Sequence, residues 1–323
     1  MNEATCPLGT RYGQGTVKRS RMIKNAFRGL AAAILLTACF AYAAGVPTEI
    51  QGRARVNGVE LYYKVVGQGP PIVVLHGGPG LEHTYLLPEM EVLADEYRLI
   101  FYDQRAVGRS SGRADRASIT WENYVKDLDE LCSALKLEKV ILLGHSWGGM
   151  LAMFYTYHHP QRVRALILVD SGGASSDFRA PFSAAIETRL TPQDQAELQQ
   201  AAGPSQRDRI VFRAYFRDRT LAQRLNLTYT PLTASQGGEV TRLMHNVSLG
   251  SFDVHQELTG FKVPTLILHG DNDPLPWQAA EKIHRYIPGS RFVLLTRCGH
   301  FPMLESPEEL FKEIRAFLKE LPA

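Results

Sequence analysis

The sequence predicts an α/β protein with a mostly parallel central sheet, helices on both faces of the sheet and a helical insertion over one edge. Three observations support this fold class: a hairpin pattern, apolar strand-like runs that alternate with helical patterns, and a long helical stretch that interrupts the alternation. With 323 residues, of which 45% are hydrophobic and 21% charged, the chain can bury one sizeable core.

Residues 1–44 differ in composition from the rest of the chain and are predicted to be a leader. Basic residues precede the apolar run Leu30–Leu36 and small residues follow it, which is the order of a secretory signal peptide. The sequence AYA at 41–43 fits a signal-peptidase site, whereas LTAC at 36–39 resembles a bacterial lipobox in which Cys39 becomes a lipidated N-terminus. We therefore expect an exported protein, periplasmic or secreted, with lipid anchoring at Cys39 and an uncleaved membrane anchor as alternatives.

The leader also carries most of the basic charge. Residues 1–43 contain six Lys or Arg and one Glu, so the formal net charge of +3 becomes −2 when they are removed. A nucleic-acid partner is therefore not expected. Beyond the leader only Cys132 and Cys298 remain, and their spacing predicts neither a disulfide framework nor a metal site. We expect no cofactor, and the sequence leaves Met1 and Met22 as alternative starts.

Short apolar runs predict the strands. Asn57-Gly58 separates the β-prone runs 53–56 and 59–66, and this dipeptide is typical of a tight hairpin. Later runs bounded by turn residues are typical of parallel strands buried on both faces. These runs are Ile72–Leu75, Leu99–Tyr102, Val140–Leu143, Ala165–Val169, Thr265–Leu268 and Phe292–Leu295.

Helical patterns lie between and after these strands. Apolar residues at three-and-four spacing over 121–137 predict an amphipathic helix, and SPEE at 306–309 predicts a capping box for the last helix. After the run 165–169, polar helical sequence at 191–200 and 207–225 replaces the strand pattern. The predicted division is a leader at 1–44, a core at 45–171 and 259–323, and a helical cap at 172–258.

Ser146 lies in a motif that exposes one hydroxyl. Its motif GHSWG follows a predicted strand and precedes a predicted helix, which is the context that a G-x-S-x-G nucleophile requires. In such a sharp turn, side chains at the two glycine positions would collide with neighbouring backbone. A serine attacks only when a base removes its proton and an acid orients that base. The motif therefore predicts a nucleophile whose partners lie elsewhere in the chain.

The base and the acid are expected on loops after later strands. His300 lies between the last strand and the last helix, so we expect it to be the base. For the acid, Asp273 competes with Asp271, and Asp170 after an earlier strand is a third candidate. Asp273 is preferred because three residues from Gly270 carry the chain past the strand end.

Backbone N–H groups are expected to stabilise the negative charge that forms on the substrate oxygen. One donor is the N–H of Trp147, the residue after the nucleophile. The other is the N–H of Gly78, in the HGGPG segment directly after a predicted strand. Glycines in that segment let the backbone approach the substrate closely.

From about Arg53 onward, the chain resembles the α/β-hydrolase superfamily and, within it, the proline iminopeptidase family of serine peptidases. The resemblance rests on HGGPG at 76–80, DQRAVGRSSG at 103–112, GHSWGG at 144–149 and CGHFP at 298–302. It implies an aminopeptidase that releases an N-terminal residue from peptides through an acyl-enzyme. The implied residues are the triad Ser146, Asp273 and His300, with Gly78 and Trp147 as oxyanion donors.

Two features depart from the family pattern. Ala106 stands where the family usually has glycine. The family binds the peptide amino terminus with acidic cap residues, often a glutamate after an aromatic cluster, but here the cluster at 213–220 reads RAYFRDRT. Glu239 and Glu257 are the remaining candidates for binding the amine. A carboxylic ester, lactone or C–C bond hydrolase is the alternative function, and a non-catalytic ligand receptor is a third. In each case the partner is a small molecule or a short peptide.

Overall fold

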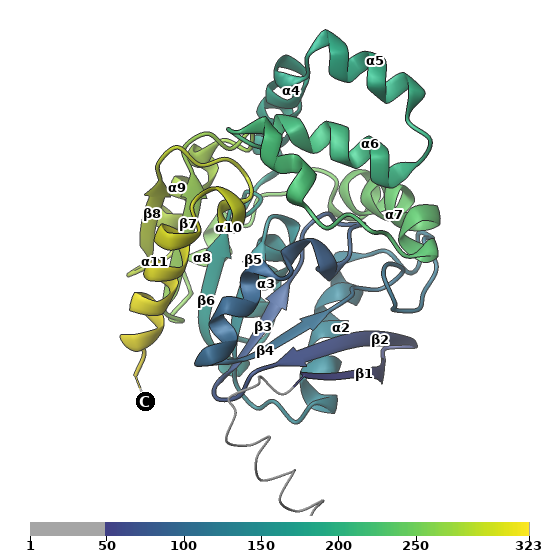
Figure 1. Cartoon of the computed structure of the whole chain (residues 1–323). Helices are drawn as coiled ribbons and strands as arrows, with labels where there is room; N and C mark the ends of the chain where they lie inside the picture. Colours follow the sequence, from purple (N-terminus) through teal and green to yellow (C-terminus); the bar gives the residue numbers. More distant parts are fainter. Residues whose placement is uncertain (1–48, 323) are drawn as a thin grey trace, which may run out of the picture. The chain divides into compact units, whose positions relative to one another are not determined.

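The computed structural model describes residues 49–322, so the predicted leader, including Cys39, lies outside the described residues. An eight-stranded sheet has the order β1-β2-β4-β3-β5-β6-β7-β8 (Figure 1). The strands are β1 (Glu49–Val56), β2 (Val59–Val66), β3 (Pro71–Leu75), β4 (Arg98–Tyr102), β5 (Val140–His145), β6 (Val163–Val169), β7 (Thr265–Gly270) and β8 (Arg291–Leu295). Every predicted strand run is therefore present.

The sheet begins with antiparallel strands and continues with parallel ones. β1 pairs with β2 and β2 with β4 in antiparallel register, whereas the pairs from β4 through β3, β5, β6 and β7 to β8 are all parallel. The hairpin turn has φ of 39° at Asn57 and 78° at Gly58, which are the residue types that adopt positive φ most easily. Ala106 also has a positive φ of 65°. At the position where the resemblance predicts glycine, the chain therefore keeps a left-handed conformation at a small cost.

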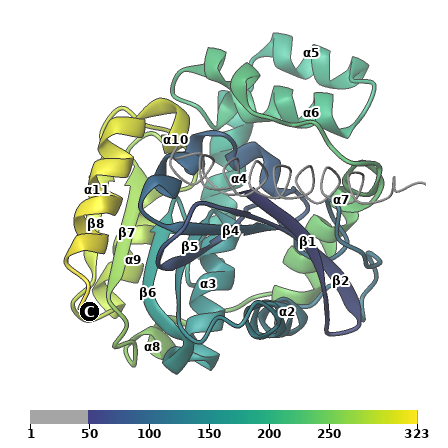
Figure 2. The ribbon, with the colours of Figure 1, turned by 60° about the horizontal axis from the view of Figure 1, so that its bottom comes forward.

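Helices cover both faces of the sheet because the strand residues alternate between two apolar clusters. Leu142 packs with α2 (Trp121–Ala134), α3 (Trp147–His158) and α9 (Trp277–Tyr286) on one face. Ile141 and Leu143 pack with the 3₁₀ helix η2 (Glu89–Asp95), α10 (Pro302–Glu305) and α11 (Pro307–Lys319) on the other. Figure 2 shows α2 and α3 together along one face. Cys132 of α2 is buried in the first cluster.

Four helices between β6 and β7 lie over one edge of the sheet (Figure 1). They are α4 (Arg179–Arg189), α5 (Pro192–Gln200), α6 (Pro204–Val211) and α7 (Pro231–Leu243), and a π-helix, η7 (Met244–Leu249), and the short α8 (His255–Leu258) follow. The helical pattern predicted at 207–225 is broken: α6 ends at Val211 and two 3₁₀ turns follow. The Glu305 carboxylate accepts the N–H groups of Arg217 and Asp218, which holds this backbone outside a helix.

The prediction of a capping box at the start of the last helix is wrong. Ser306 caps α11 without a side-chain bond to the backbone, and its hydroxyl lies 3.4 Å from the Glu309 carboxylate instead. A capping box does form at Thr191, whose hydroxyl accepts the Asp194 N–H while the Asp194 carboxylate accepts the Thr191 N–H.

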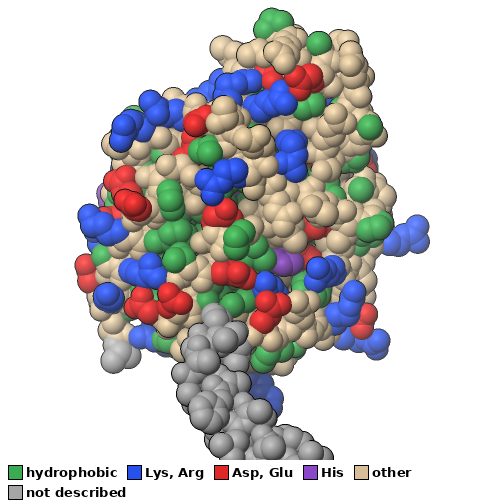
Figure 3. Space-filling model, in the orientation of Figure 1, with side chains coloured by type: hydrophobic (Ala, Val, Ile, Leu, Met, Phe, Trp, Pro, Cys, Tyr) green, Lys and Arg blue, Asp and Glu red, His purple; other side chains and the backbone are tan. Residues whose placement is uncertain are grey.

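Of the helices within residues 49–322, none is long and apolar enough to cross a membrane. Basic and acidic side chains are interspersed on the face shown in Figure 3.

Candidate active site

Ser146 occupies a strained turn between β5 and α3. Its φ of 57° and ψ of −123° are sparsely populated for a residue with a side chain. A Cβ on Gly144 would collide with the carbonyl of Gly148, and one on Gly148 with the carbonyl of Leu75. Both glycines are therefore required for the close approach of β5, α3 and β3. The turn places Ser146 at the C-terminal end of β5, where it lines a pocket.

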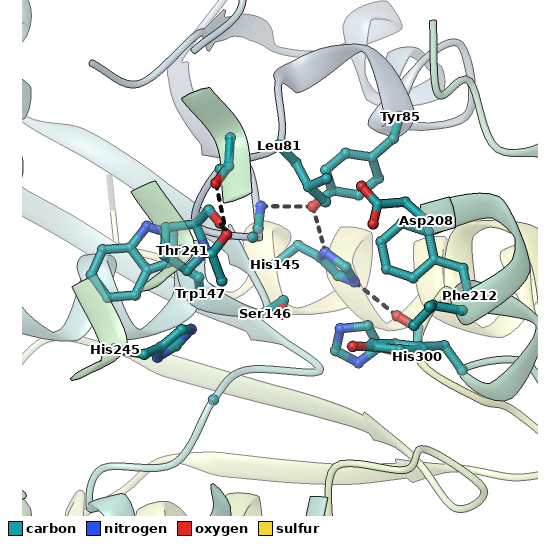
Figure 4. A pocket seen from close by; sticks show the side chains of 18 of the residues that line it. Leu81, Tyr85, His145, Ser146, Trp147, Asp208, Phe212, Thr241, His245 and His300 are labelled. Atoms are coloured by element: carbon teal, nitrogen blue, oxygen red, sulfur yellow. Dashed lines mark hydrogen bonds between the residues drawn. The ribbon is translucent and has the colours of Figure 1, made fainter. Parts of the chain in front are cut away.

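His300 and Asp273 form a buried pair at the same edge of the sheet. The Nδ1 atom of His300 lies 2.7 Å from Oδ2 of Asp273, and Oδ1 of Asp273 accepts the Leu275 N–H at 2.8 Å. Burial lowers the pKa of His300 and raises the pKa of Asp273 above its usual value. With a proton on Nδ1, the other ring nitrogen of His300 can accept one. His300 and Ser146 line the same pocket, as the spacing of the loops predicts (Figure 4).

The other candidate acids have different environments. Asp271 is exposed and its Oδ1 accepts the Cys298 N–H at 3.1 Å, so it holds the turn. Asp170 is fully buried at the end of β6, and its Oδ1 accepts the Gly270 N–H at 2.8 Å. Asp273 is the carboxylate that contacts His300.

The two residues whose N–H groups are predicted to stabilise the oxyanion, Gly78 and Trp147, belong to the HGGPG loop and to the start of α3. Gly78 has a φ of 118°, and a Cβ there would lie 2.8 Å from the Leu81 nitrogen. A Cβ on the preceding Gly77 would lie 2.9 Å from Cβ of Ser146, so this loop packs against the nucleophile turn. Trp147 begins α3, and the first N–H groups of a helix have no intrahelical acceptor. Gly78 and Trp147 both line the pocket.

A buried hydrogen-bond chain links the three loops of the site, and the sequence interpretation missed it. The Gly77 N–H donates to the Tyr85 hydroxyl at 2.7 Å, and this hydroxyl lies 2.7 Å from Nδ1 of His145. Nε2 of His145 lies 2.8 Å from the carbonyl of His300, so the proton is on Nε2 and the hydroxyl donates to Nδ1. Burial keeps the pKa of His145 well below its usual value. The only sequence signal was His145 inside the serine motif.

Replacing Tyr85 by phenylalanine is expected to lower the free energy of unfolding by about 1–3 kcal/mol, because it leaves the buried Gly77 N–H without an acceptor. Urea unfolding measures this loss. Tyr63→Phe is the matched control, since the Tyr63 hydroxyl makes no hydrogen bond within residues 49–322. Equal stability losses in the two variants would contradict a role for the chain of hydrogen bonds.

The DQR segment supports the same loops. The Gln104 side chain donates to the carbonyl of His76 at 2.8 Å and accepts the Trp147 indole N–H at 2.8 Å. Arg105 makes two bonds to Asp127, at 2.6 and 2.5 Å. Gln104 therefore fixes the HGGPG loop relative to the residue that follows the nucleophile.

The pocket has a volume of about 330 Å³ and lies between the sheet edge and the cap. Asp208 on α6 is the one carboxylate among its lining residues within the described part of the chain, and its Oδ2 accepts the Tyr229 hydroxyl at 2.8 Å. Burial raises the pKa of Asp208. His245 of the π-helix lines the opposite side from His300, with Ser146 between them in the view of Figure 4. The rest of the wall is largely apolar, including Leu81, Met150, Phe178, Phe182, Val211, Phe212, Leu275 and Phe301.

Glu239 and Glu257 do not line this pocket, which corrects the expectation that they bind an amine there. Glu239 pairs with Arg242 along α7 at 2.6 and 2.7 Å, with 42% of its side chain exposed. Glu257 lines a separate hollow beside Trp121 and Phe154. The helical spacing of the cap did not indicate which of its faces meets the sheet.

Comparisons with known proteins identify relatives over most of the chain. Residues 70–307 match the family described as alpha/beta hydrolase fold. The proline iminopeptidase of Lactobacillus acidophilus is 30% identical over 288 residues, covering 83% of this chain and 98% of the relative. The crystal structure of proline iminopeptidase from Mycobacterium smegmatis aligns with a TM-score of 0.63 at 24% identity, over 84% of this chain and 98% of that one. A meta-cleavage product hydrolase from Pseudomonas fluorescens aligns with a TM-score of 0.66 at 20% identity and the same coverage.

Proposed function

The chain belongs to the alpha/beta hydrolase fold family and, within it, to the proline iminopeptidases, and from this premise we propose that it is a serine hydrolase that releases the N-terminal residue of short peptides. The observation that carries the proposal is the buried His300–Asp273 pair, whose imidazole lines one pocket with a serine held in a nucleophile turn.

Each residue has a defined step in the proposed reaction. His300 accepts the proton of the Ser146 hydroxyl while the serine oxygen attacks the substrate carbonyl. The N–H groups of Gly78 and Trp147 stabilise the oxyanion, and the proton passes from His300 to the leaving amine, which leaves an acyl-enzyme. His300 then activates water, which hydrolyses the acyl-enzyme and regenerates Ser146. Asp273 keeps the proton on Nδ1 of His300 and stabilises the imidazolium.

We assign binding of the substrate ammonium to Asp208. It is the acidic group among the described lining residues, and an ammonium within reach would favour its ionised form despite the burial that raises its pKa. The apolar walls then accommodate the side chain of the N-terminal residue, and a ring such as that of proline fits this chemistry.

A substrate panel tests the reaction type. The purified enzyme is assayed with prolyl and alanyl anilides, with the same anilides acetylated at the amine, and with short acyl esters. The proposal predicts efficient cleavage of the free-amine anilides and about tenfold or greater loss of kcat/KM on acetylation, because a charge-assisted bond to the ammonium is lost. If no anilide is cleaved efficiently, the aminopeptidase assignment is wrong even when the esters are hydrolysed.

Replacing Asp208 by asparagine is expected to raise KM for free-amine anilides about tenfold and to leave acyl ester hydrolysis within about twofold. Asparagine keeps an acceptor for Tyr229, so the packing of α6 is preserved. Asp218→Asn is the control, because Asp218 is an exposed cap carboxylate outside the pocket. Equal effects of Asp208→Asn on both substrate classes would contradict ammonium binding by Asp208.

Hydrolysis of a carboxylic ester, a lactone or a C–C bond is the second candidate. The observation in its favour is the apolar wall of the pocket, in which a single half-buried carboxylate already bonds to Tyr229. The same triad would perform such a reaction without an ammonium ligand. Esters that outperform every anilide in the panel would select this alternative.

We further propose that the chain is exported, on the basis of the leader pattern at 1–44. Mass spectrometry of the mature N-terminus, after expression in a bacterium that exports it, tests this. A start at Ala44 supports signal-peptidase cleavage, and a lipidated Cys39 supports anchoring. An intact leader on cytoplasmic protein would contradict export.

A further inference from the structure

We propose that Asp170 is protonated and donates a hydrogen bond to Asp273, so that the acid of the triad is a carboxylic acid–carboxylate pair and Asp170 is a positioning residue. The inference concerns the same site as the proposed function and relies on it for the activity measurements. The protonation itself can be tested without any substrate.

The geometry brings two carboxyl groups together out of contact with water. β6 and β7 are neighbours, and Asp170 follows the end of β6 with its N–H donated to the carbonyl of Leu268 at 2.9 Å. Asp170 has an exposure of 0% and Asp273 of 7%. One polar side-chain atom from each of Asp170, His269 and Asp273 lies within 4.8 Å of the others.

The hydrogen bonds show which oxygen needs a proton. Asp273 accepts an N–H with each oxygen, one from Leu275 and one from His300, which suits an anion. Asp170 accepts one N–H, from Gly270, and its Oδ2 has no partner although it is buried. A carboxylate oxygen cannot donate, so beside another carboxylate it stays unsatisfied, whereas a protonated Oδ2 donates to Asp273 and satisfies both groups.

Electrostatics favours the same arrangement. Two adjacent buried carboxyl groups cannot both ionise without a large cost, so one of them keeps its proton at neutral pH. Burial raises the pKa of both carboxyl groups. His269 opposes the rise for Asp170 and the neighbouring Asp273 adds to it, whereas the bond from Asp170 lowers the pKa of Asp273. Their shared proton therefore belongs to Asp170.

The surrounding charged and titratable groups are consistent with a single anion. His269 lies with Nε2 2.9 Å from the carbonyl of Leu275, to which it donates, and 3.5 Å from Oδ2 of Asp273, whereas its Nδ1 is buried without a hydrogen-bond partner among the described residues. Burial raises the pKa of the Cys298 thiol, so it adds no charge near Asp170. Arg189 acts on Asp273 from the cap and lowers the pKa of that carboxyl. His300 is the group that Asp273 orients, and Tyr215, whose pKa is raised by burial and by Asp273, packs against the His300 ring.

Two substitutions separate the protonated from the ionised form of Asp170. Asparagine copies the protonated acid, because its carbonyl accepts the Gly270 N–H and its amide donates to Asp273. Asp170→Asn is therefore expected to retain kcat/KM within about threefold of wild type, with the acid limb of the pH profile unmoved. Asp170→Ala removes the donor, so we expect about tenfold lower kcat and an acid limb shifted upward by about half a pH unit, because Asp273 then stabilises the imidazolium of His300 more strongly.

An ionised Asp170 predicts the opposite shift. Asp170→Asn would then remove a negative charge beside the triad and move the acid limb to lower pH, and that result would overturn the proposal. Loss of activity in Asp170→Asn equal to that in Asp170→Ala, with both variants folded, would overturn it as well.

Infrared difference spectroscopy of wild type against Asp170→Asn measures the proton directly. We expect a protonated carboxylic acid band at neutral pH in wild type that disappears in the variant. Because this readout needs no turnover, it remains decisive if Asp170→Ala fails to fold or if the chain proves not to be a hydrolase. Absence of the band would overturn the proposal. So would one equivalent of a divalent metal retained by wild type and lost in Asp170→Asn, since the cluster would then be a metal site.

Discussion

Ser146→Ala is expected to lower kcat/KM by a factor on the order of 10⁵, because no other group in the proposed reaction can form the acyl-enzyme. The hydroxyl makes no hydrogen bond to another described residue, and alanine tolerates the positive φ of this turn about as well as serine does. The fold should therefore be unchanged. The measurement is steady-state hydrolysis of the best substrate in the panel, together with thermal unfolding.

Ser235→Ala provides the matched control for this prediction. Ser235 is exposed on α7, and its hydroxyl bonds to the Leu232 carbonyl within the same helix. We expect a fluorophosphonate to label wild type and Ser235→Ala but not Ser146→Ala. Substantial turnover by a folded Ser146→Ala would contradict the serine mechanism, and labelling of that variant would place the reactive group elsewhere.

Much of the fold could be predicted because its signals are local. The hairpin depends on Asn57-Gly58, the strands on short apolar runs, and the nucleophile turn on two glycines whose neighbours leave no room for a side chain. The loop positions of Asp273 and His300 follow from the common edge at which parallel strands end. Their bond of 2.7 Å agrees with that expectation.

The rest of the site depends on contacts between segments far apart in sequence. Whether Asp208 or Glu239 faces the pocket is decided by how the cap helices pack on the sheet, and helical periodicity does not contain that information. The Tyr85–His145 bond joins residues 60 positions apart. Asp170 was an alternative acid in the sequence, and only the pairing of β6 with β7 shows that it lies beside Asp273.

Asp273→Asn is expected to reduce kcat by a factor of about 10⁴ with little change in KM. The Leu275 N–H requires an acceptor at the position of Oδ1, so the asparagine amide nitrogen must occupy the position of Oδ2 and face His300. An amide donates there, which moves the ring proton from Nδ1 to Nε2 and removes the lone pair that must accept the serine proton.

Asp271→Asn is the control for this substitution, because Asp271 holds the neighbouring turn through the Cys298 N–H and does not contact His300. We expect it to keep kcat within about threefold of wild type. Raising the pH should not rescue Asp273→Asn between pH 6 and 8, since the defect is a tautomer and not a protonation state. If Asp273→Asn remained active while Asp170→Asn lost its activity, Asp170 would be the acid of the triad, and the shared proton would belong to Asp273 instead.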